Sequence, residues 1–456
     1  MTNPGQWITK GVAMLRPGLD AKEDRPRGAA AAETPARSTR ERLGATFGRS
    51  REALSPRVLR RTLTQLQAIV DPRVSEVEGG RRAKALADWY LQASPEERRD
   101  CWLLMSEQFG PDPAKLQLAR LQYEAAQGSA EEGAAEIRLR RAFTSPRTRL
   151  LQRFAAFPEG MRFLVDLRAE LLPHLKADKR LLPLDAELES LFSTWFDVAF
   201  LELRRISWDS PASLVEKLIK YEAVHDIRSW GDVKNRLDSD RRCYGFFHPR
   251  LPDEPLIFVE VAFADGMADC ITPLLDESAA PCDLSRATAA IFYSISNTQT
   301  GLRGVSFGDS LIKRVVETLK VDLPKLKTFA TLSPIPGLRA WMQKNAPAEL
   351  LAGLDDPLAL PAKSPLRAQA LAWAARYLGK ETQDGKPLDA VARFHLGNGA
   401  RVERLNWAGD PSPKGLKQSY GVMVNYLYDL KRLDKHRTLL SQGQIPVSGA
   451  VEALYG

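Results

Sequence analysis

The sequence predicts two domains of different class, an all-α helical bundle over residues 55–185 and an α/β domain over residues 186–456. Between residues 55 and 182, apolar residues recur at helical spacing almost without interruption. After residue 186, β-prone stretches alternate with helical ones, a pattern typical of α/β folds. A chain of 456 residues is also long enough for two domains with separate cores.

Residues 1–54 are expected to form a mostly disordered arm, because they are rich in Arg, Ala, Pro, Gly and Glu and show little periodicity. The start of this arm lacks the apolar segment and cleavage site of a signal peptide. No run in the chain approaches the roughly 18 apolar residues that span a bilayer. The four cysteines are widely spaced and form no C-x-x-C pair, which favours a reducing compartment over a metal or disulfide framework. We therefore expect a cytoplasmic protein with no membrane partner.

The formal net charge of +8 has two explanations. Arginines scattered over helix faces make an ordinary solvated surface, which is the commoner case. The same charge also attracts an anionic ligand. The basic residues form no compact stripe with interleaved aromatic residues, so we do not expect nucleic acid as a partner.

The helical half begins at 56–70, where the leucines lie at near-helical spacing. The sequence Ser94-Pro-Glu-Glu is a typical helix start, with an N-cap, a proline at the first position and an acidic first turn. Further helices are expected at 113–127, 131–143, 146–156 and 158–176. Together they predict an all-α bundle joined by short loops. None of these helices carries a catalytic constellation. We expect the bundle to support self-association.

The α/β half opens with helices expected at 186–204 and 211–223 and with strands expected at 241–247 and 255–263. Apolar residues alternate along the second strand. Glu260 lies inside that strand, and its carboxylate either reaches a cleft or faces solvent at a sheet edge.

The stretch 289–337 reads as a strand, a glycine-rich turn, a helix and a second strand. The first strand is expected at 289–296, and the second, at 328–332, ends at Ser333 against a corner formed by Pro334 and Pro336. A helix that begins behind a glycine-rich turn presents unpaired N–H groups and a partial positive charge, so it can hold a phosphate group. An ordinary turn before a core helix is an equally good interpretation of this loop taken alone.

The last part of the chain contains a short helix that Asp389 caps and that ends at Gly397-Asn398-Gly399. Strands are expected at 401–407 and 421–428. A hairpin around Asn398-Gly399 is the alternative interpretation of the turn.

Two residues of this half suit acid–base chemistry. His395 lies between Phe394 and Leu396, and an apolar neighbourhood can hold a histidine near neutrality, where it gives and takes protons at physiological pH. Ser333 ends a strand beside a rigid proline corner, which fixes the direction of its hydroxyl. Taken alone, a structural histidine and a turn-capping serine are the commoner roles.

Several phrases of the sequence resemble the malonyl-CoA decarboxylase family. They are AIFYSISNTQTGLRGVSFGDSLIKRVVE, TLSPIPG, VARFHLGNGARVERLNW, NYLYDL, EPLIFVEVAF and WDSPASLVEKLIKYEAVH. The resemblance runs from about residue 55 to residue 430 and is strongest after residue 190. The turn that follows the strand 289–296 also resembles the Arg/Gln-x-x-Gly-x-Gly pyrophosphate loop of acetyltransferase-like (GNAT) folds, with Ser306 in place of the first glycine.

The resemblance implies a GNAT-like α/β catalytic domain that converts malonyl-CoA to acetyl-CoA and CO2 without a metal or an organic cofactor. It implies that Ser333 and His395 act as a pair, one accepting a proton or orienting the substrate and the other donating, and that Tyr428 lines the site. No G-x-S-x-G sequence surrounds Ser333, so we do not expect an acyl-enzyme. The loop residues implied in holding the coenzyme A pyrophosphate are Arg303, Gly304, Val305, Ser306, Phe307, Gly308 and Asp309.

Two other functions fit the same loop. A CoA-dependent acyltransferase of the GNAT type would use it together with an acceptor amine, and a non-catalytic regulator would only bind coenzyme A. Malonyl-CoA is the expected substrate, and a homo-oligomer formed through the helical domain is the expected assembly.

Overall fold

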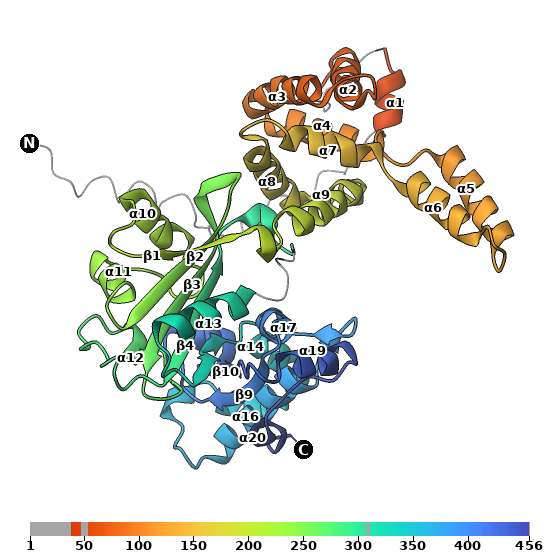
Figure 1. Cartoon of the computed structure of the whole chain (residues 1–456). Helices are drawn as coiled ribbons and strands as arrows, with labels where there is room; N and C mark the ends of the chain where they lie inside the picture. The colour runs from red at the N-terminus through yellow and green to blue at the C-terminus, as the bar shows by residue number, and fades with distance from the viewer. Residues whose placement is uncertain (1–37, 47–52, 306, 308–310, 456) are drawn as a thin grey trace, which may run out of the picture.

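The computed structural model describes residues 38–46, 53–305, 307 and 311–455. A helical N-terminal part precedes a mixed α/β domain, so the predicted fold class is confirmed (Figure 1). The predictions made for residues 1–37 and 47–52, and those for Ser306, Gly308 and Asp309, lie outside the described residues.

Serine caps and N-terminal prolines define the helices of the first part. Ser55, Ser75, Ser94 and Ser145 each accept a hydrogen bond from a backbone N–H of the following first turn, which satisfies a donor that a helix start leaves unpaired. The helices are α1 (Thr39–Gly44), α2 (Pro56–Val70), α3 (Glu76–Gln92), α4 (Pro95–Glu107), α5 (Pro113–Ala126), α6 (Glu132–Phe143), α7 (Pro146–Ala155), α8 (Gly160–Leu171) and α9 (Leu182–Trp195).

Helix α1 lies inside the segment that was expected to be an arm. Ser38 and Glu41 form a capping box at its start. The guanidinium of Arg42 forms a buried ion pair with Asp100 of α4, with N–O distances of 2.5 and 2.6 Å. This pair attaches α1 to the helical bundle.

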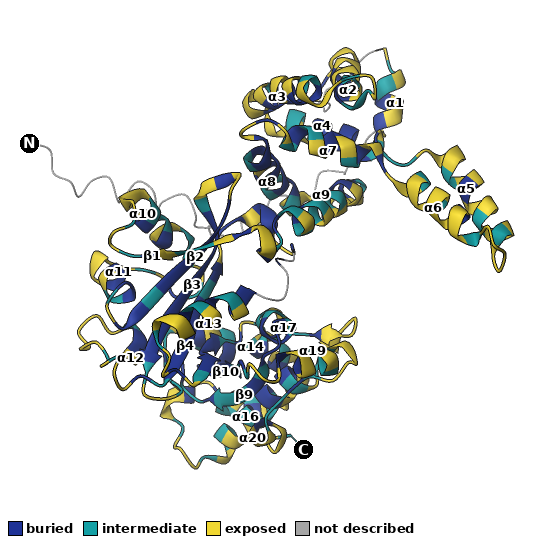
Figure 2. Cartoon of the chain, in the orientation of Figure 1, coloured by how far each residue is buried: buried dark blue, intermediate teal, exposed yellow. Residues whose placement is uncertain are grey.

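Helices α5 and α6 pack against each other and project from the bundle (Figure 1). Most of their surface is exposed (Figure 2). Their exposed side chains include large apolar ones, at Leu118, Leu121, Ile137 and Phe143.

The α/β domain is built on an eight-stranded sheet of order β1-β2-β3-β4-β5-β10-β6, and β9 pairs with β10 off this path. All pairs are antiparallel except β4 with β5, which run parallel and pair between Ala289–Phe292 and Thr328–Thr331. The strands are β1 (Glu202–Ile206), β2 (Arg241–His248), β3 (Leu251–Ala264), β4 (Ala289–Asn297), β5 (Thr328–Thr331), β6 (Ser333–Pro334), β9 (Arg401–Asn406) and β10 (Met423–Leu427). Central strands β2, β3 and β4 are almost wholly buried (Figure 2).

The helices of this domain cover the sheet and its ends. A small separate sheet pairs β7 (Thr382–Gln383) with β8 (Lys386–Pro387). The helices are α10 (Ala212–Tyr221), α11 (Trp230–Arg236), α12 (Thr272–Leu275), α13 (Leu311–Asp322), α14 (Leu338–Asn345), α15 (Ala348–Gly353), α16 (Pro365–Gly379), α17 (Ala390–Gly397), α18 (Pro413–Ser419), α19 (Leu433–Ser441) and α20 (Gly449–Glu452).

One local prediction is wrong, and one alternative interpretation is excluded. The helix expected over 186–204 is α9, which ends at Trp195, and residues 202–206 form strand β1 at the edge of the sheet. The alternative hairpin at Asn398-Gly399 is also absent: Asn398 ends α17, and Gly399, with φ of +85°, turns the chain into β9.

The helical part packs directly behind the turn 299–307. Arg168 of α8 is buried, and it donates hydrogen bonds to the carbonyls of Gly301 at 2.8 Å and Arg303 at 2.9 Å. Asp185 of α9 holds the same guanidinium at 2.8 Å. The backbones are so close here that a Cβ on Gly301 would lie 1.9 Å from the Val165 carbonyl oxygen. The position of the turn is therefore set from the helical side.

No helix in the described part of the chain is long and apolar enough to cross a membrane.

Candidate active site

A cavity of about 290 Å³ opens where β4 continues beyond its pairing with β5. The end of β4, the turn before α13, strand β6 and helix α17 form its wall. Most of the wall is apolar. Its residues are Val224, Ile257, Phe292, Tyr293, Ile295, Asn297, Val305, Phe307, Ser333, Pro334, Ala390, Val391, Phe394 and His395.

Ser333 reaches the cavity from the short strand β6, which pairs with the first two residues of β10. Its partner in the register is Val424. The serine is buried, and its hydroxyl donates a hydrogen bond to Thr331 Oγ1 at 2.9 Å. Two strands and a neighbouring hydroxyl therefore hold Ser333 at the cavity wall.

His395 reaches the same wall from α17. Asp389 caps this helix by accepting hydrogen bonds from the N–H groups of Val391 and Ala392, both at 2.9 Å. The imidazole is buried, and its Nε2 lies 3.2 Å from Ser333 Oγ. Burial lowers the pKa of His395 to about 3, because a charged imidazolium would lose its hydration. The side chain is therefore neutral at physiological pH.

Two tyrosines from the end of β10 complete the surroundings of His395. The Tyr428 hydroxyl lies 2.7 Å from His395 Nδ1. The Tyr426 ring stacks on the imidazole at 4.7 Å between ring centroids. Burial raises the pKa of Tyr428 well above its usual value, so the phenol keeps its proton. The structure thus brings the three predicted catalytic residues, His395, Ser333 and Tyr428, into one hydrogen-bonded row, and their catalytic roles stay a prediction.

Thr331 is a member of this row that the sequence analysis missed. Its Oγ1 accepts hydrogen bonds from Ser333 Oγ at 2.9 Å and from the Tyr426 backbone N–H at 3.1 Å. The spacing of Thr331 and Ser333 was the available signal, because residues two apart in an extended segment point to the same side.

The predicted pyrophosphate loop is described in part. Arg303 is exposed, and Gly304 adopts a φ of +82°, which glycine accommodates without strain. Val305 and Phe307 are buried and line the cavity. Helix α13, which follows the turn, begins at Leu311.

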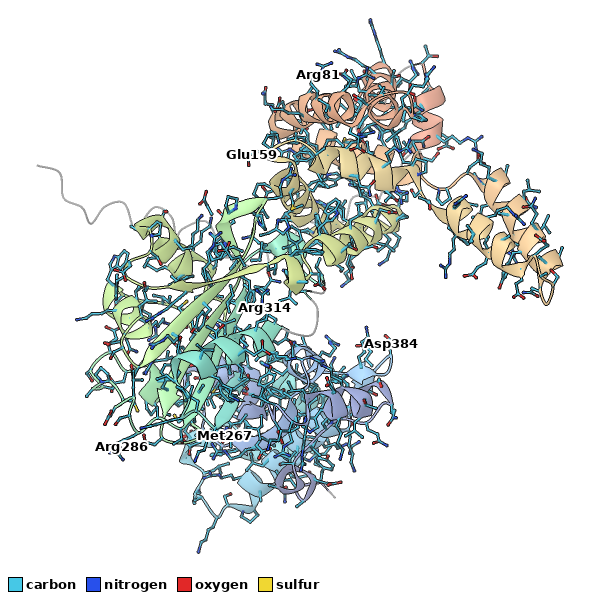
Figure 3. All side chains as sticks on the ribbon, viewed as in Figure 1. Arg81, Glu159, Met267, Arg286, Arg314 and Asp384 are labelled. Carbon is cyan, nitrogen blue, oxygen red and sulfur yellow. The ribbon has the colours of Figure 1, made fainter. Side chains whose placement is uncertain are left out.

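Two basic residues of α13 differ in how far their side chains are exposed. Lys313 is exposed on the solvated face of the helix. Arg314, which Figure 3 labels, is half-buried. It donates hydrogen bonds to the carbonyls of Val198 at 2.5 Å and Leu201 at 2.7 Å. Arg314 therefore links α13 to the segment between α9 and β1.

Glu260 neither reaches the cavity nor faces solvent, so both sequence-based alternatives are wrong. It lies in the central strand β3 and is 1% exposed. Arg236 of α11 donates to its Oε2 at 2.7 Å and to Asp232 Oδ1 at 2.8 Å. Burial, reinforced by the nearby carboxylate of Glu222, raises the pKa of Glu260 to about 7. This cluster belongs to the interior of the domain.

Among the described residues, no group of three or more His, Cys, Asp or Glu side chains is arranged to hold a metal ion. A neutral histidine between two hydroxyl groups, at the wall of an apolar cavity in an α/β domain, is the kind of site that acid–base enzymes carry.

The sequence model of the malonyl-CoA decarboxylase C-terminal domain matches residues 199–455, and that of the N-terminal domain matches residues 109–196. The chain belongs to the malonyl-CoA decarboxylase family.

Known relatives agree with this assignment over most of the chain. The mitochondrial malonyl-CoA decarboxylase of Anser anser anser is 35% identical over 77% of this chain and 78% of its own length. The Rattus norvegicus enzyme of the same name is 37% identical over 65% of this chain and 68% of its own length. These matches support the decarboxylase prediction and not the acyltransferase alternative.

Solved structures give the same result. The crystal structure of malonyl-CoA decarboxylase from Rhodopseudomonas palustris is 42% identical, with a TM-score of 0.77 over 87% of this chain and 99% of that one. The one from Agrobacterium vitis is 41% identical, with a TM-score of 0.78 over 87% of this chain and 100% of that one.

Proposed function

We propose that the chain decarboxylates malonyl-CoA to acetyl-CoA and CO2. The observation that carries this proposal is the neutral His395, held between the hydroxyls of Ser333 and Tyr428 at the wall of an apolar cavity, in a chain of this family.

In the proposed reaction, the bond between the malonyl α-carbon and its carboxylate carbon breaks. The electron pair moves into the thioester as an enolate, and CO2 leaves. A proton from His395 then forms the new C–H bond, and water restores that proton, so one proton is consumed for each CO2 released. A neutral imidazole is a competent acid here because a thioester enolate is far more basic than the groups that histidine usually protonates.

The apolar wall helps the first step. A carboxylate surrounded by side chains such as Phe292, Phe394 and Val391 is poorly solvated, whereas the departing CO2 is neutral and the remaining charge is spread over the enolate. A hydrogen bond from the His395 imidazole can then stabilise the enolate before its proton passes to carbon.

We propose that the turn 303–309 holds the coenzyme A pyrophosphate ahead of α13. The support is that Val305 and Phe307 line the same cavity as Ser333 and His395, so an acyl group carried from this turn has a short path to the imidazole. We also propose that no metal or organic cofactor takes part, since the thioester itself accepts the electron pair.

A coupled assay tests the reaction. The protein is incubated with malonyl-CoA alone, with and without a chelator, and both acetyl-CoA and CO2 are measured. We expect equal amounts of the two products and the same rate with the chelator. Turnover that requires an added amine would indicate an acyltransferase, binding without turnover would indicate a regulator, and a chelator-sensitive rate would contradict the metal-free reaction.

We further propose that the chain self-associates through the helical domain and works in the cytoplasm. The exposed apolar residues of α5 and α6 support the first statement, because a monomeric protein rarely leaves such a hairpin uncovered. All four cysteines are free, which is the usual state in a reducing compartment.

The self-association predicts a change in mass. Leu121→Glu combined with Ile137→Glu should convert the oligomer to a smaller species in light scattering coupled to size exclusion, because both changes place a charge in the buried interface. Gln122→Glu, which adds a charge on the same exposed helix without removing an apolar group, is the control. If the double variant keeps the mass of the wild type, then α5 and α6 do not form the interface.

A further inference from the structure

The hydroxyl of Thr331 forms a hydrogen bond with Ser333, which in turn contacts His395. Thr331 is completely buried at the end of β5. The geometry of the 2.9 Å contact makes Ser333 Oγ the donor and Thr331 Oγ1 the acceptor. The same Thr331 oxygen accepts the Tyr426 N–H at 3.1 Å, so the strand register holds it in place.

Counting the available protons assigns the donor and the acceptor in the other two hydrogen bonds of this row. A serine hydroxyl has one proton, and Ser333 gives it to Thr331. The contact of 3.2 Å between Ser333 Oγ and His395 Nε2 is then a hydrogen bond only if Nε2 carries the proton. A neutral imidazole has a proton on one nitrogen alone, so Nδ1 is bare and accepts from the Tyr428 hydroxyl at 2.7 Å.

The electrostatics of the site agree with this count. The lowered pKa of His395 excludes a second proton on the ring, and the raised pKa of Tyr428 keeps the phenol as a donor. The stacked ring of Tyr426 adds no competing polar atom to the imidazole edge, because its contact is face to face.

We infer that Thr331 is a positioning residue that fixes His395 as the Nε2–H tautomer, with its proton directed at Ser333 and the cavity. This inference rests on the proposed function in one respect: the proton on Nε2 is the one delivered to the substrate. The hydrogen bonds point in the opposite direction to those of a nucleophilic serine triad. In such a triad, serine donates to Nε2 and a third group accepts from Nδ1–H. Ser333 therefore serves as a hydrogen-bonding group and does not form an acyl-enzyme.

The tautomer can be observed directly. The chain contains only five histidines, so the protein can be labelled with ¹⁵N-histidine and the His395 signals identified by their loss in His395→Gln. We expect a protonated Nε2 and an unprotonated Nδ1 in the resting protein at pH 7.5. An Nδ1–H tautomer would overturn the inference, whatever the activity.

Two variants of Thr331 complete the test. Thr331→Val keeps the shape but removes the acceptor, so Ser333 is free to donate to Nε2 and the imidazole proton moves to Nδ1. We expect kcat to fall about 10- to 100-fold with KM held within about threefold, since the group that protonates carbon carries its proton on the wrong nitrogen. Thr331→Ser, which keeps the hydroxyl, should restore the Nε2–H signal and most of the turnover.

The outcomes separate this inference from the proposed function. If the protein shows the Nε2–H tautomer but does not decarboxylate malonyl-CoA, the inference about Thr331 holds and the proposed reaction is wrong. Thr331→Val with normal kcat, or with reduced kcat but unchanged ¹⁵N signals, would overturn the inference and leave the reaction intact. Melting temperatures of the two variants show whether the strand is still formed; if Thr331→Val does not fold, the wild-type and Thr331→Ser spectra decide the question.

Discussion

His395 combines three conditions that rarely occur together: it is buried, it is neutral, and both of its ring nitrogens contact hydroxyl groups. Burial explains the neutrality, because the ring lies against Tyr426 and away from charged side chains. A histidine in this state can deliver a proton only to a strongly basic acceptor, which is what decarboxylation of a thioester produces.

The first prediction concerns turnover. His395→Gln should lower kcat by roughly 10²-fold or more, since it removes a proton donor at the reacting carbon. KM for malonyl-CoA should change little, because the proposed nucleotide site lies at the turn 303–309. The measurement is a steady-state assay of acetyl-CoA formation. A variant with normal kcat would assign the proton donor to another residue.

The second prediction concerns how the free energy of unfolding depends on pH. The pKa of His395 is near 6.5 in the unfolded chain and about 3 in the folded protein, so below pH 6.5 the unfolded chain binds a proton that the folded protein does not. The free energy of unfolding therefore falls as the pH drops from 6.5 towards 3, by up to about 1.4 kcal/mol per pH unit for this residue. His225, whose pKa is lowered to about 4 by burial, acts in the same direction.

Urea denaturation between pH 7.5 and 4.5 measures this effect. His395→Gln should flatten the pH dependence by about one proton relative to the wild type. Parallel curves for the wild type and His395→Gln would mean that the imidazole is protonated in the folded protein.

The sequence was sufficient to select Ser333, His395 and Tyr428, because these residues stand in phrases that resemble a known family. It was not sufficient for Thr331, whose role depends on the pairing of β10 with both β5 and β6. Such a role arises from contacts between residues far apart in the sequence: Ser333 and His395 are 62 positions apart, and Thr331 and Tyr426 are 95 positions apart.

At the scale of elements, helix α11 is fixed to strand β3 by Arg236. This residue is 1% exposed and bonds to Glu260, to Asp232 and to the carbonyl of His225. Removing one partner of a buried ion pair is costly because the charge that remains has lost its hydration and its counterion.

The third prediction follows from this contact. Arg236→Met should lower the free energy of unfolding by about 3–5 kcal/mol. Arg204→Met, which breaks the exposed pair with Glu202, should cost much less. Chemical denaturation measures both. Adding Glu260→Gln to Arg236→Met should recover part of the loss, and no recovery would mean that the penalty comes from packing instead.

The strands of the sheet interior were predictable because apolar β-prone residues dominate positions 256–263 of β3 and 289–293 of β4. Strand β1 was not predictable in the same way. It lies at the edge of the sheet and its five residues, ELRRI, are mostly polar and partly exposed. Charged residues are typical of edge strands, and they remove the periodic signal on which the prediction depends.

At the scale of the whole molecule, the helical part supports the turn ahead of α13. Arg168 bonds to two carbonyls of that turn, and Arg162 bonds to Gln299 at 2.7 Å. The phosphate-holding role proposed for the turn therefore depends on a residue from the other half of the chain. The sequence alone did not indicate this dependence, because the helical half carries no motif of its own for binding.

The fourth prediction tests this support. Arg168→Lys cannot reach both carbonyls with the same geometry, so KM for malonyl-CoA should rise about tenfold while kcat changes less than about threefold, as for a lost binding contact. Malonyl-pantetheine, which lacks the pyrophosphate, should be turned over equally well by the variant and the wild type. Arg98→Lys, whose partner is Glu170 within the helical part, is the control. Equal losses with both substrates would indicate a general structural defect.

The contact between Gly301 and Val165 has a practical consequence for anyone who engineers this protein. Main chain lies against main chain at that point, leaving no space for even a methyl group. A chimera that takes its first half from one relative and its second half from another must preserve the shape of both surfaces. An isolated C-terminal fragment would present an unsupported, partly apolar face to water. The two halves are best expressed, mutated and exchanged as a single unit.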